Sequence, residues 1–188
     1  MRIALALMVS CWMFSCAGSD DDAGSNTTDP NVTDTAVLAD FEDALDVHNA
    51  ERAAVATSPS LEPLRWSNEL ASYAQAWVNE LARRNCEPEH RPREGEFKQL
   101  YGENLAWGTS LSGRDASLLW ASEKQDYNAE SHACKQGAVC GHYTQMVWRN
   151  SKELGCASVE CQLGNGRTRE IVACNYDPPG NFIGQDPY

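Results

Sequence analysis

Apolar residues return every three or four positions along several stretches of the chain, which is the spacing of an amphipathic helix. The first such stretch covers residues 36–56. A second helix is predicted over residues 68–84, with Ser67 as its N-cap, because small polar residues favour that position. Its expected buried stripe is Leu70, Ala74, Trp77 and Leu81. Shorter apolar patterns predict a third helix over residues 113–127 and a fourth over 141–148.

Two segments near the C-terminus have the character of strands. They cover residues 154–162 and 169–176, and the turn residues Gly164-Asn165-Gly166 lie between them. This arrangement predicts a β-hairpin. The stretch 87–99 is polar, contains two prolines and is predicted to be a loop. Helices combined with an antiparallel hairpin indicate an α+β layered domain.

The N-terminus has the pattern of an export signal. Met1-Arg2 precedes a short apolar run, Ile3 to Val9, which is too short to span a bilayer. Cys16 resembles the lipid-modified cysteine of bacterial lipoproteins, and Cys11 is a weaker candidate. The alternative is an ordinary cleaved signal that discards both cysteines.

These features divide the chain into three parts. Residues 1–16 are predicted to be a signal peptide of the lipoprotein type, 17–36 a disordered polar tether, and 37–188 one folded domain. We therefore expect an exported protein at the extracellular or cell-envelope surface, held by an N-terminal lipid anchor.

Composition and charge exclude some classes of partner. Hydrophobic content is 42% and charged content 22%, which suits a globular domain with a core. The formal net charge of -12 argues against nucleic acid, because phosphate binding requires a positive surface. It also argues against docking by charge on anionic lipid, so membrane contact is expected only through the lipid anchor.

The predicted domain contains six cysteines: Cys86, Cys134, Cys140, Cys156, Cys161 and Cys174. An even number in an exported chain favours three disulfides. Their number leaves the pairing open, and their spacing does not match the paired cysteines of a zinc ribbon.

Several segments, in chain order, resemble the motifs of the CAP superfamily (SCP/TAPS domain), which contains cysteine-rich secretory, antigen-five and plant pathogenesis-related proteins. The matching segments are His48–Arg52, Leu64–Trp66, Tyr101–Ala106, Trp120–Lys124, Gly141–Trp148 and Cys174–Asn181. The resemblance spans roughly residues 41–188 and is strongest to the plant branch from Trp120 onward. It implies a three-layer α-β-α sandwich with a central antiparallel sheet. It also implies the disulfides Cys86–Cys161, Cys134–Cys140 and Cys156–Cys174.

The same resemblance implies a cleft that gathers two histidines and two glutamates: His90, Glu103, Glu123 and His142. His90 keeps the family's spacing from Cys86, but Arg91 replaces the serine that usually follows the histidine. Imidazole nitrogens of His90 and His142 suit Zn²⁺ or another divalent cation, with the glutamates as ligands or orienting groups. Alternatively, the four side chains satisfy one another as a buried polar network.

Three functions follow as hypotheses. The first is a non-catalytic extracellular binding module for a lipid or sterol, a small ligand or a protein partner, as family members suggest. The second is a metal-dependent hydrolase or peptidase, in which Glu103 or Glu123 is the general base and the metal activates water. The third is a structural envelope protein with a vestigial cleft. The sequence contains no Gly-x-Ser-x-Gly or His-Glu-x-x-His motif, which disfavours familiar hydrolases, and we rank binding first.

Overall fold

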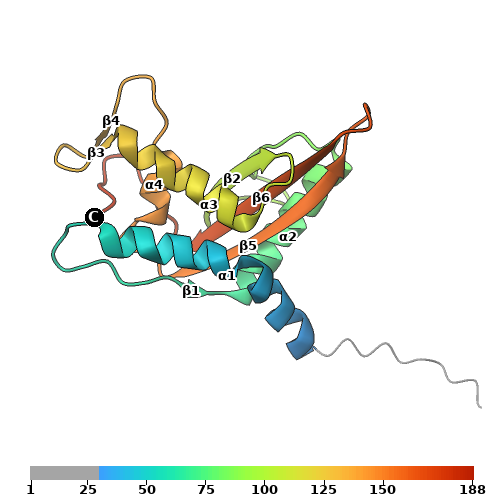
Figure 1. The fold of residues 1–188 in the computed structure, drawn as a ribbon, viewed down its shortest axis with the longest axis horizontal. Helices are drawn as coiled ribbons and strands as arrows, with labels where there is room; N and C mark the ends of the chain where they lie inside the picture. The colour runs from blue at the N-terminus through green and yellow to red at the C-terminus, as the bar shows by residue number, and fades with distance from the viewer. Residues whose placement is uncertain (1–29) are drawn as a thin grey trace, which may run out of the picture.

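A computed structural model describes residues 30–188, with side chains from Phe41 onward (Figure 1). The predicted signal peptide and Cys16 lie outside the described residues, so both stay predictions. Helix α1 (Pro30–Ala54) begins within the stretch predicted to be a tether. Proline favours a first helical turn, because its fixed φ suits the helix and its missing N–H is not needed there.

The central sheet has the strand order β1-β5-β6-β2. Its strands are β1 (Arg65–Trp66), β5 (Glu153–Gln162), β6 (Thr168–Asp177) and β2 (Gly102–Gly108). The three longer strands pair antiparallel, as the family resemblance implies. The two-residue strand β1 adds a parallel edge to β5, so the complete sheet is mixed.

Helices cover both faces of this sheet (Figure 1). Helix α2 (Asn68–Arg83) packs on one face, where its Trp77 and Leu81 meet Ile171 of β6. On the other face lie α1, α3 (Gly113–Ser122) and the short α4 (Gly141–Met146). Alternate residues of β6 serve the two cores, since Val172 faces the α1 side. The predicted three-layer α-β-α sandwich is confirmed.

Helix α2 rests directly on the backbone of β5. A Cβ atom on Gly155 would lie 2.2 Å from the backbone nitrogen of Ala71 and 2.5 Å from the carbonyl oxygen of Ser67. Only glycine permits this approach, so Gly155 sets the distance between helix and sheet.

The helix predicted over residues 113–127 is shorter in the structure. Helix α3 ends at Ser122, and a 3-10 turn, η1, covers Glu123–Asp126. A two-stranded sheet of β3 (Tyr127–Asn128) and β4 (Ala133–Cys134) follows and leads to α4. The change of helix type matters because Glu123 stands at the junction.

Two disulfides are formed, Cys134–Cys140 and Cys156–Cys174. The third implied pair, Cys86 with Cys161, is not bonded in the structure, and both residues are buried thiols. Burial raises the pKa of the Cys161 thiol to about 12, and the neighbouring Cys86 thiol adds to this shift. The Cys86 thiol also lies 3.9 Å from the carbonyl oxygens of Ala82 and Gln162. Cys86 and Cys161 belong to the same buried cluster beneath α2, so the implied partners lie in one core but are not joined.

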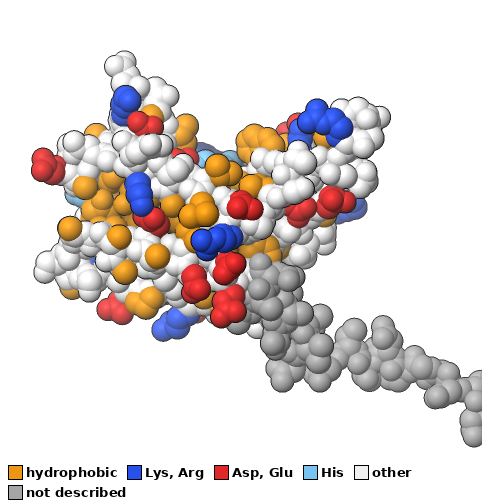
Figure 2. Space-filling view, viewed as in Figure 1, with side chains coloured by type: hydrophobic (Ala, Val, Ile, Leu, Met, Phe, Trp, Pro, Cys, Tyr) orange, Lys and Arg blue, Asp and Glu red, His pale blue; other side chains and the backbone are white. Residues whose placement is uncertain are grey.

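The surface agrees with the acidic composition. Acidic side chains gather along the outer side of α1 (Figure 2), where Glu42, Asp43 and Asp46 are exposed. Within residues 30–188, every helix is too short or too polar to cross a bilayer.

Candidate functional site

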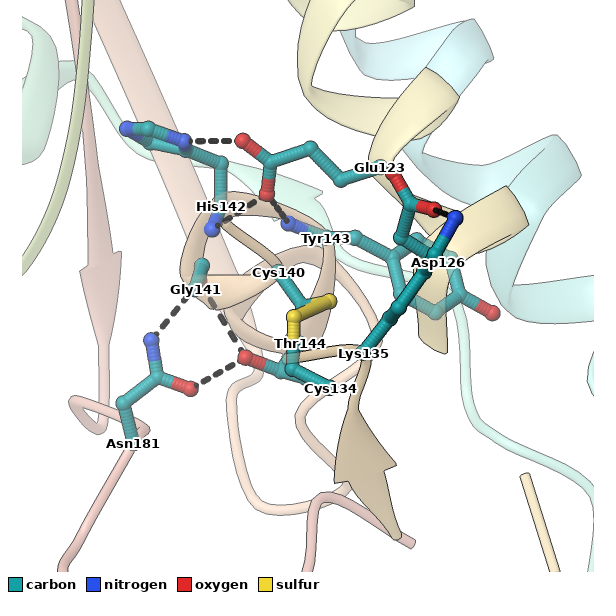
Figure 3. Close-up of a disulfide and its surroundings, with 10 residues drawn as sticks. All are labelled: Glu123, Asp126, Cys134, Lys135, Cys140, Gly141, His142, Tyr143, Thr144 and Asn181. Atoms are coloured by element: carbon teal, nitrogen blue, oxygen red, sulfur yellow. Dashed lines mark hydrogen bonds and ion pairs between the residues drawn. A yellow bond between two sulfur atoms is a disulfide. The ribbon is translucent and has the colours of Figure 1, made fainter. Parts of the chain in front are cut away.

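Glu123 and His142 form the first of two histidine–glutamate pairs (Figure 3). The Oε1 atom of Glu123 lies 2.5 Å from Nδ1 of His142. Its Oε2 atom accepts the backbone N–H groups of His142 at 3.0 Å and Tyr143 at 3.2 Å. These amides belong to the first turn of α4, where backbone donors have no partner within the helix. Glu123 therefore accepts hydrogen bonds from the unpaired backbone N–H groups at the start of α4 and also orients the His142 ring.

His90 and Glu103 form the second pair. Oε1 of Glu103 lies 2.7 Å from Nδ1 of His90 and accepts the backbone N–H of Arg91 at 3.1 Å. The Glu103 side chain is fully buried on β2, whereas the His90 side chain is 56% exposed. The hydrogen bond to Glu103 raises the pKa of His90, although partial burial acts against it.

Contacts between β2 and α4 bring the two pairs to one junction. Asn104, next to Glu103 on β2, donates to the carbonyl oxygen of His142 at 3.0 Å. Gly102 leaves room for the Gln145 side chain of α4, because a Cβ there would lie 2.3 Å from its Oε1 atom. A hollow of about 420 Å³ opens beside this junction, and Glu103 and Gln145 contribute to its lining.

The four predicted residues thus form two separate pairs, His90 with Glu103 and His142 with Glu123. Within residues 41–188, no group of three or more His, Cys, Asp or Glu side chains is arranged to hold a metal ion. In both pairs the carboxylate engages Nδ1, and Nε2 is the ring nitrogen left for a ligand. Carboxylates orient metal-binding imidazoles in this way.

A buried chain of hydrogen bonds connects the site to α1. Asn104 donates to the hydroxyl of Tyr176 at 2.9 Å, and that hydroxyl lies 2.7 Å from Nε2 of His48. Nδ1 of His48 lies 2.7 Å from the carbonyl oxygen of Ala44. The ring is fully buried, and burial lowers the pKa of His48 to about 4. A neutral His48 completes the chain, because it donates from Nδ1 and accepts the Tyr176 hydroxyl at Nε2.

Like His48, Arg52 of α1 contacts residues far from its own helix. The Arg52 guanidinium donates to the carbonyl oxygens of Met146 at 3.0 Å and Trp148 at 2.8 Å. It therefore holds the C-terminal end of α4, while Glu123 holds its N-terminal end.

Asn104 was not identified from the sequence as a site residue. Its place beside Glu103 in a segment that matches the family was the available signal. Trp120 stacks on the His142 ring with centroids 6.2 Å apart.

Comparison with known proteins identifies the family of this chain. The model of the cysteine-rich secretory protein family, CAP, matches residues 45–176. Pathogenesis-related protein 1C of Nicotiana tabacum is 48% identical over 149 residues, which are 78% of this chain and 80% of the relative. Pathogenesis-related protein 1 of Arabidopsis thaliana is 45% identical over 148 residues, covering 78% and 81%.

Solved structures share the fold. Venom allergen-like protein 4 of Schistosoma mansoni is 27% identical with a TM-score of 0.56, covering 82% of this chain and 92% of the other. NaASP2, solved with Zn²⁺, is 23% identical with a TM-score of 0.62, covering 79% and 84%. The secretory family supports the export predicted from the N-terminus. The family match over most of the folded domain and the close plant relatives show that this chain is a member of the cysteine-rich secretory protein family, CAP.

Proposed function

We propose that the protein is an exported, non-catalytic binding module in which His90 and His142 take a divalent cation such as Zn²⁺. The observation that carries the proposal is the common geometry of the two pairs, in which a glutamate fixes Nδ1 and leaves Nε2 for a ligand. A protein of the same fold, NaASP2, has been solved with Zn²⁺, which agrees with this assignment.

The donor set indicates the kind of cation site. Structural zinc sites use four protein ligands, whereas two imidazoles at a shared junction leave most positions to water or to a bound partner. We therefore expect reversible binding rather than a site on which folding depends. The adjoining hollow of about 420 Å³ is within the range of small-ligand pockets. A lipid, a sterol or an extracellular protein segment remains the predicted occupant.

The state of the glutamates favours binding over hydrolysis. A general base needs an oxygen within reach of the water or group that it deprotonates. Both oxygens of Glu123 are engaged, one by the His142 ring and the other by two backbone amides. The side chain of Glu103 is fully buried. Neither carboxylate is placed as a base toward a substrate.

Calorimetry with Zn²⁺ tests the proposal. We expect heat of binding at about pH 8, where an ordinary imidazole is neutral. H90A and H142A should each weaken binding, and the double variant should abolish it. H132A is the matched control, because His132 contacts Tyr127 and lies outside both pairs. Unchanged binding by the double variant would refute the cation assignment. Chelator-sensitive cleavage of a peptide or ester library, lost in H142A, would refute the non-catalytic assignment.

A further inference from the structure

We infer that Arg91 is a positioning residue, whose guanidinium holds the buried Glu103 carboxylate in the orientation that fixes His90. Its importance for ligand binding depends on the proposed function, but the contact itself does not. Arg91 stands where the sequence departs from the family pattern, so the family resemblance assigns it no role.

The Arg91 side chain is itself held in one place. It is buried, and its guanidinium carbon lies 3.6 Å from the centroid of the Tyr73 ring and 5.4 Å from that of Trp77. One terminal nitrogen donates to the carbonyl oxygen of Phe97 at 3.4 Å, and the other donates to that of Tyr73. A planar guanidinium clamped by rings and carbonyls has little freedom to turn.

The fixed guanidinium faces Glu103. Its Nε lies 3.8 Å from Oε2 of Glu103, which is an ion-pair distance too long for a hydrogen bond, and neither atom has a hydrogen-bond partner among residues 41–188. The backbone N–H of Arg91 donates to Oε1, the oxygen that also contacts His90. A carboxylate removed from water requires a nearby positive charge or several hydrogen bonds. Arg91 supplies a charge beside one oxygen and a donor to the other.

The other pair is held differently. Glu123 is fixed by two amides of α4. Among residues 41–188, its ion-pair partner is His142, and no Arg or Lys nitrogen lies within 4.0 Å of its carboxylate. Loss of the Arg91 side chain should therefore disturb His90 and spare His142. This difference supplies an internal control within one molecule.

Nuclear magnetic resonance of metal-free protein with ¹⁵N-labelled histidine tests the inference. In the wild type, the His90 Nδ1–H proton should be shifted downfield and slow to exchange, because it donates to Glu103. In R91M we expect this resonance to move upfield or to be lost through exchange, with the His142 resonances unchanged. R84M is the matched control, because Arg84 also lies over Trp77, at 5.5 Å, but pairs with Glu80 instead of Glu103.

Two further variants separate positioning from general loosening of the fold. R91K keeps the charge but not the planar fork, so it should fold and give an intermediate His90 signal. If Arg91 acts through Glu103, adding R91M to E103Q should change the His90 signal no further. An unchanged His90 resonance in R91M, an equal change at His142, or an added effect in the E103Q background would overturn the inference.

The readout is independent of metal, so a protein that binds no Zn²⁺ would defeat the proposed function and leave this test valid. If Zn²⁺ does bind, R91M should weaken its affinity by about 10-fold, as changes to groups that orient metal ligands do.

Discussion

Lowering the pH from neutral to about 4 should reduce the free energy of unfolding of this protein through the titration of His48. Burial lowers the pKa of His48 from 6.5 to about 4, while the Ala44 carbonyl opposes the shift and the Arg52 charge adds to it. The unfolded chain therefore binds a proton between these values that the folded chain excludes. The contribution of neutral His48 to the free energy of unfolding is fully present above pH 6.5 and falls as the pH decreases toward 4.

The size of this effect follows from the shift. Each pKa unit corresponds to about 1.4 kcal/mol, so His48 contributes about 3 kcal/mol to the free energy of unfolding at neutral pH. Because the ring is fully buried, solvent does not screen this contribution. A charged ring would also place an N–H toward the Tyr176 hydroxyl, which now serves His48 as a donor and Asn104 as an acceptor.

Urea unfolding of the wild type and of H48Q across this pH range measures the effect. Glutamine can retain a donor and an acceptor but does not titrate, so the difference between the two proteins isolates His48. We expect the stability advantage of the wild type to shrink by about 3 kcal/mol from pH 7 to 4. His90 acts with the opposite sign, because its raised pKa favours the folded state at low pH, but it cancels in the difference. A difference that does not change with pH would refute the reasoning.

Two other predictions concern the framework of the fold. G155A should lower the free energy of unfolding by about 3 kcal/mol, because the new Cβ meets the backbone of Ala71, whereas G164A at an open turn should be nearly neutral in the same urea assay. Alkylation of the unfolded, unreduced protein should label Cys86 and Cys161, and the native protein should resist labelling because both thiols are buried. Mass spectrometry that finds these two cysteines unlabelled after unfolding would show that they form a disulfide.

The sequence predicted most accurately those features that depend on the local spacing of apolar residues. The stripe of Leu70, Ala74, Trp77 and Leu81 is buried in α2, because a helix that covers a sheet must turn one apolar face inward. The end of α3 was placed too late, since the apolar pattern continues past Ser122 while the backbone changes to a 3-10 turn. Periodicity does not record that Glu123 is needed at the start of α4.

The site depended on contacts that no local pattern contains. Family resemblance identified the two histidines and two glutamates, but their pairing came only from the structure. The chain from Asn104 through Tyr176 to His48 joins residues 72 and 128 positions apart. Arg91 was visible in the sequence only as a departure from the family pattern. Its clamp by Tyr73 and Phe97 requires the loop to return to α2, which composition does not encode.

The buried Cys156–Cys174 disulfide joins directly opposed residues of β5 and β6. It therefore fixes the register of these two strands covalently. Strands can slip past one another in steps of one residue, and each step turns every side chain to the opposite face. The bond forbids that step between β5 and β6. Strand β2 is aligned with β6 residue by residue, and Glu103 stands opposite Asn175, the neighbour of Cys174. The position along the sheet of the carboxylate that orients His90 is therefore set in part by a disulfide in another pair of strands.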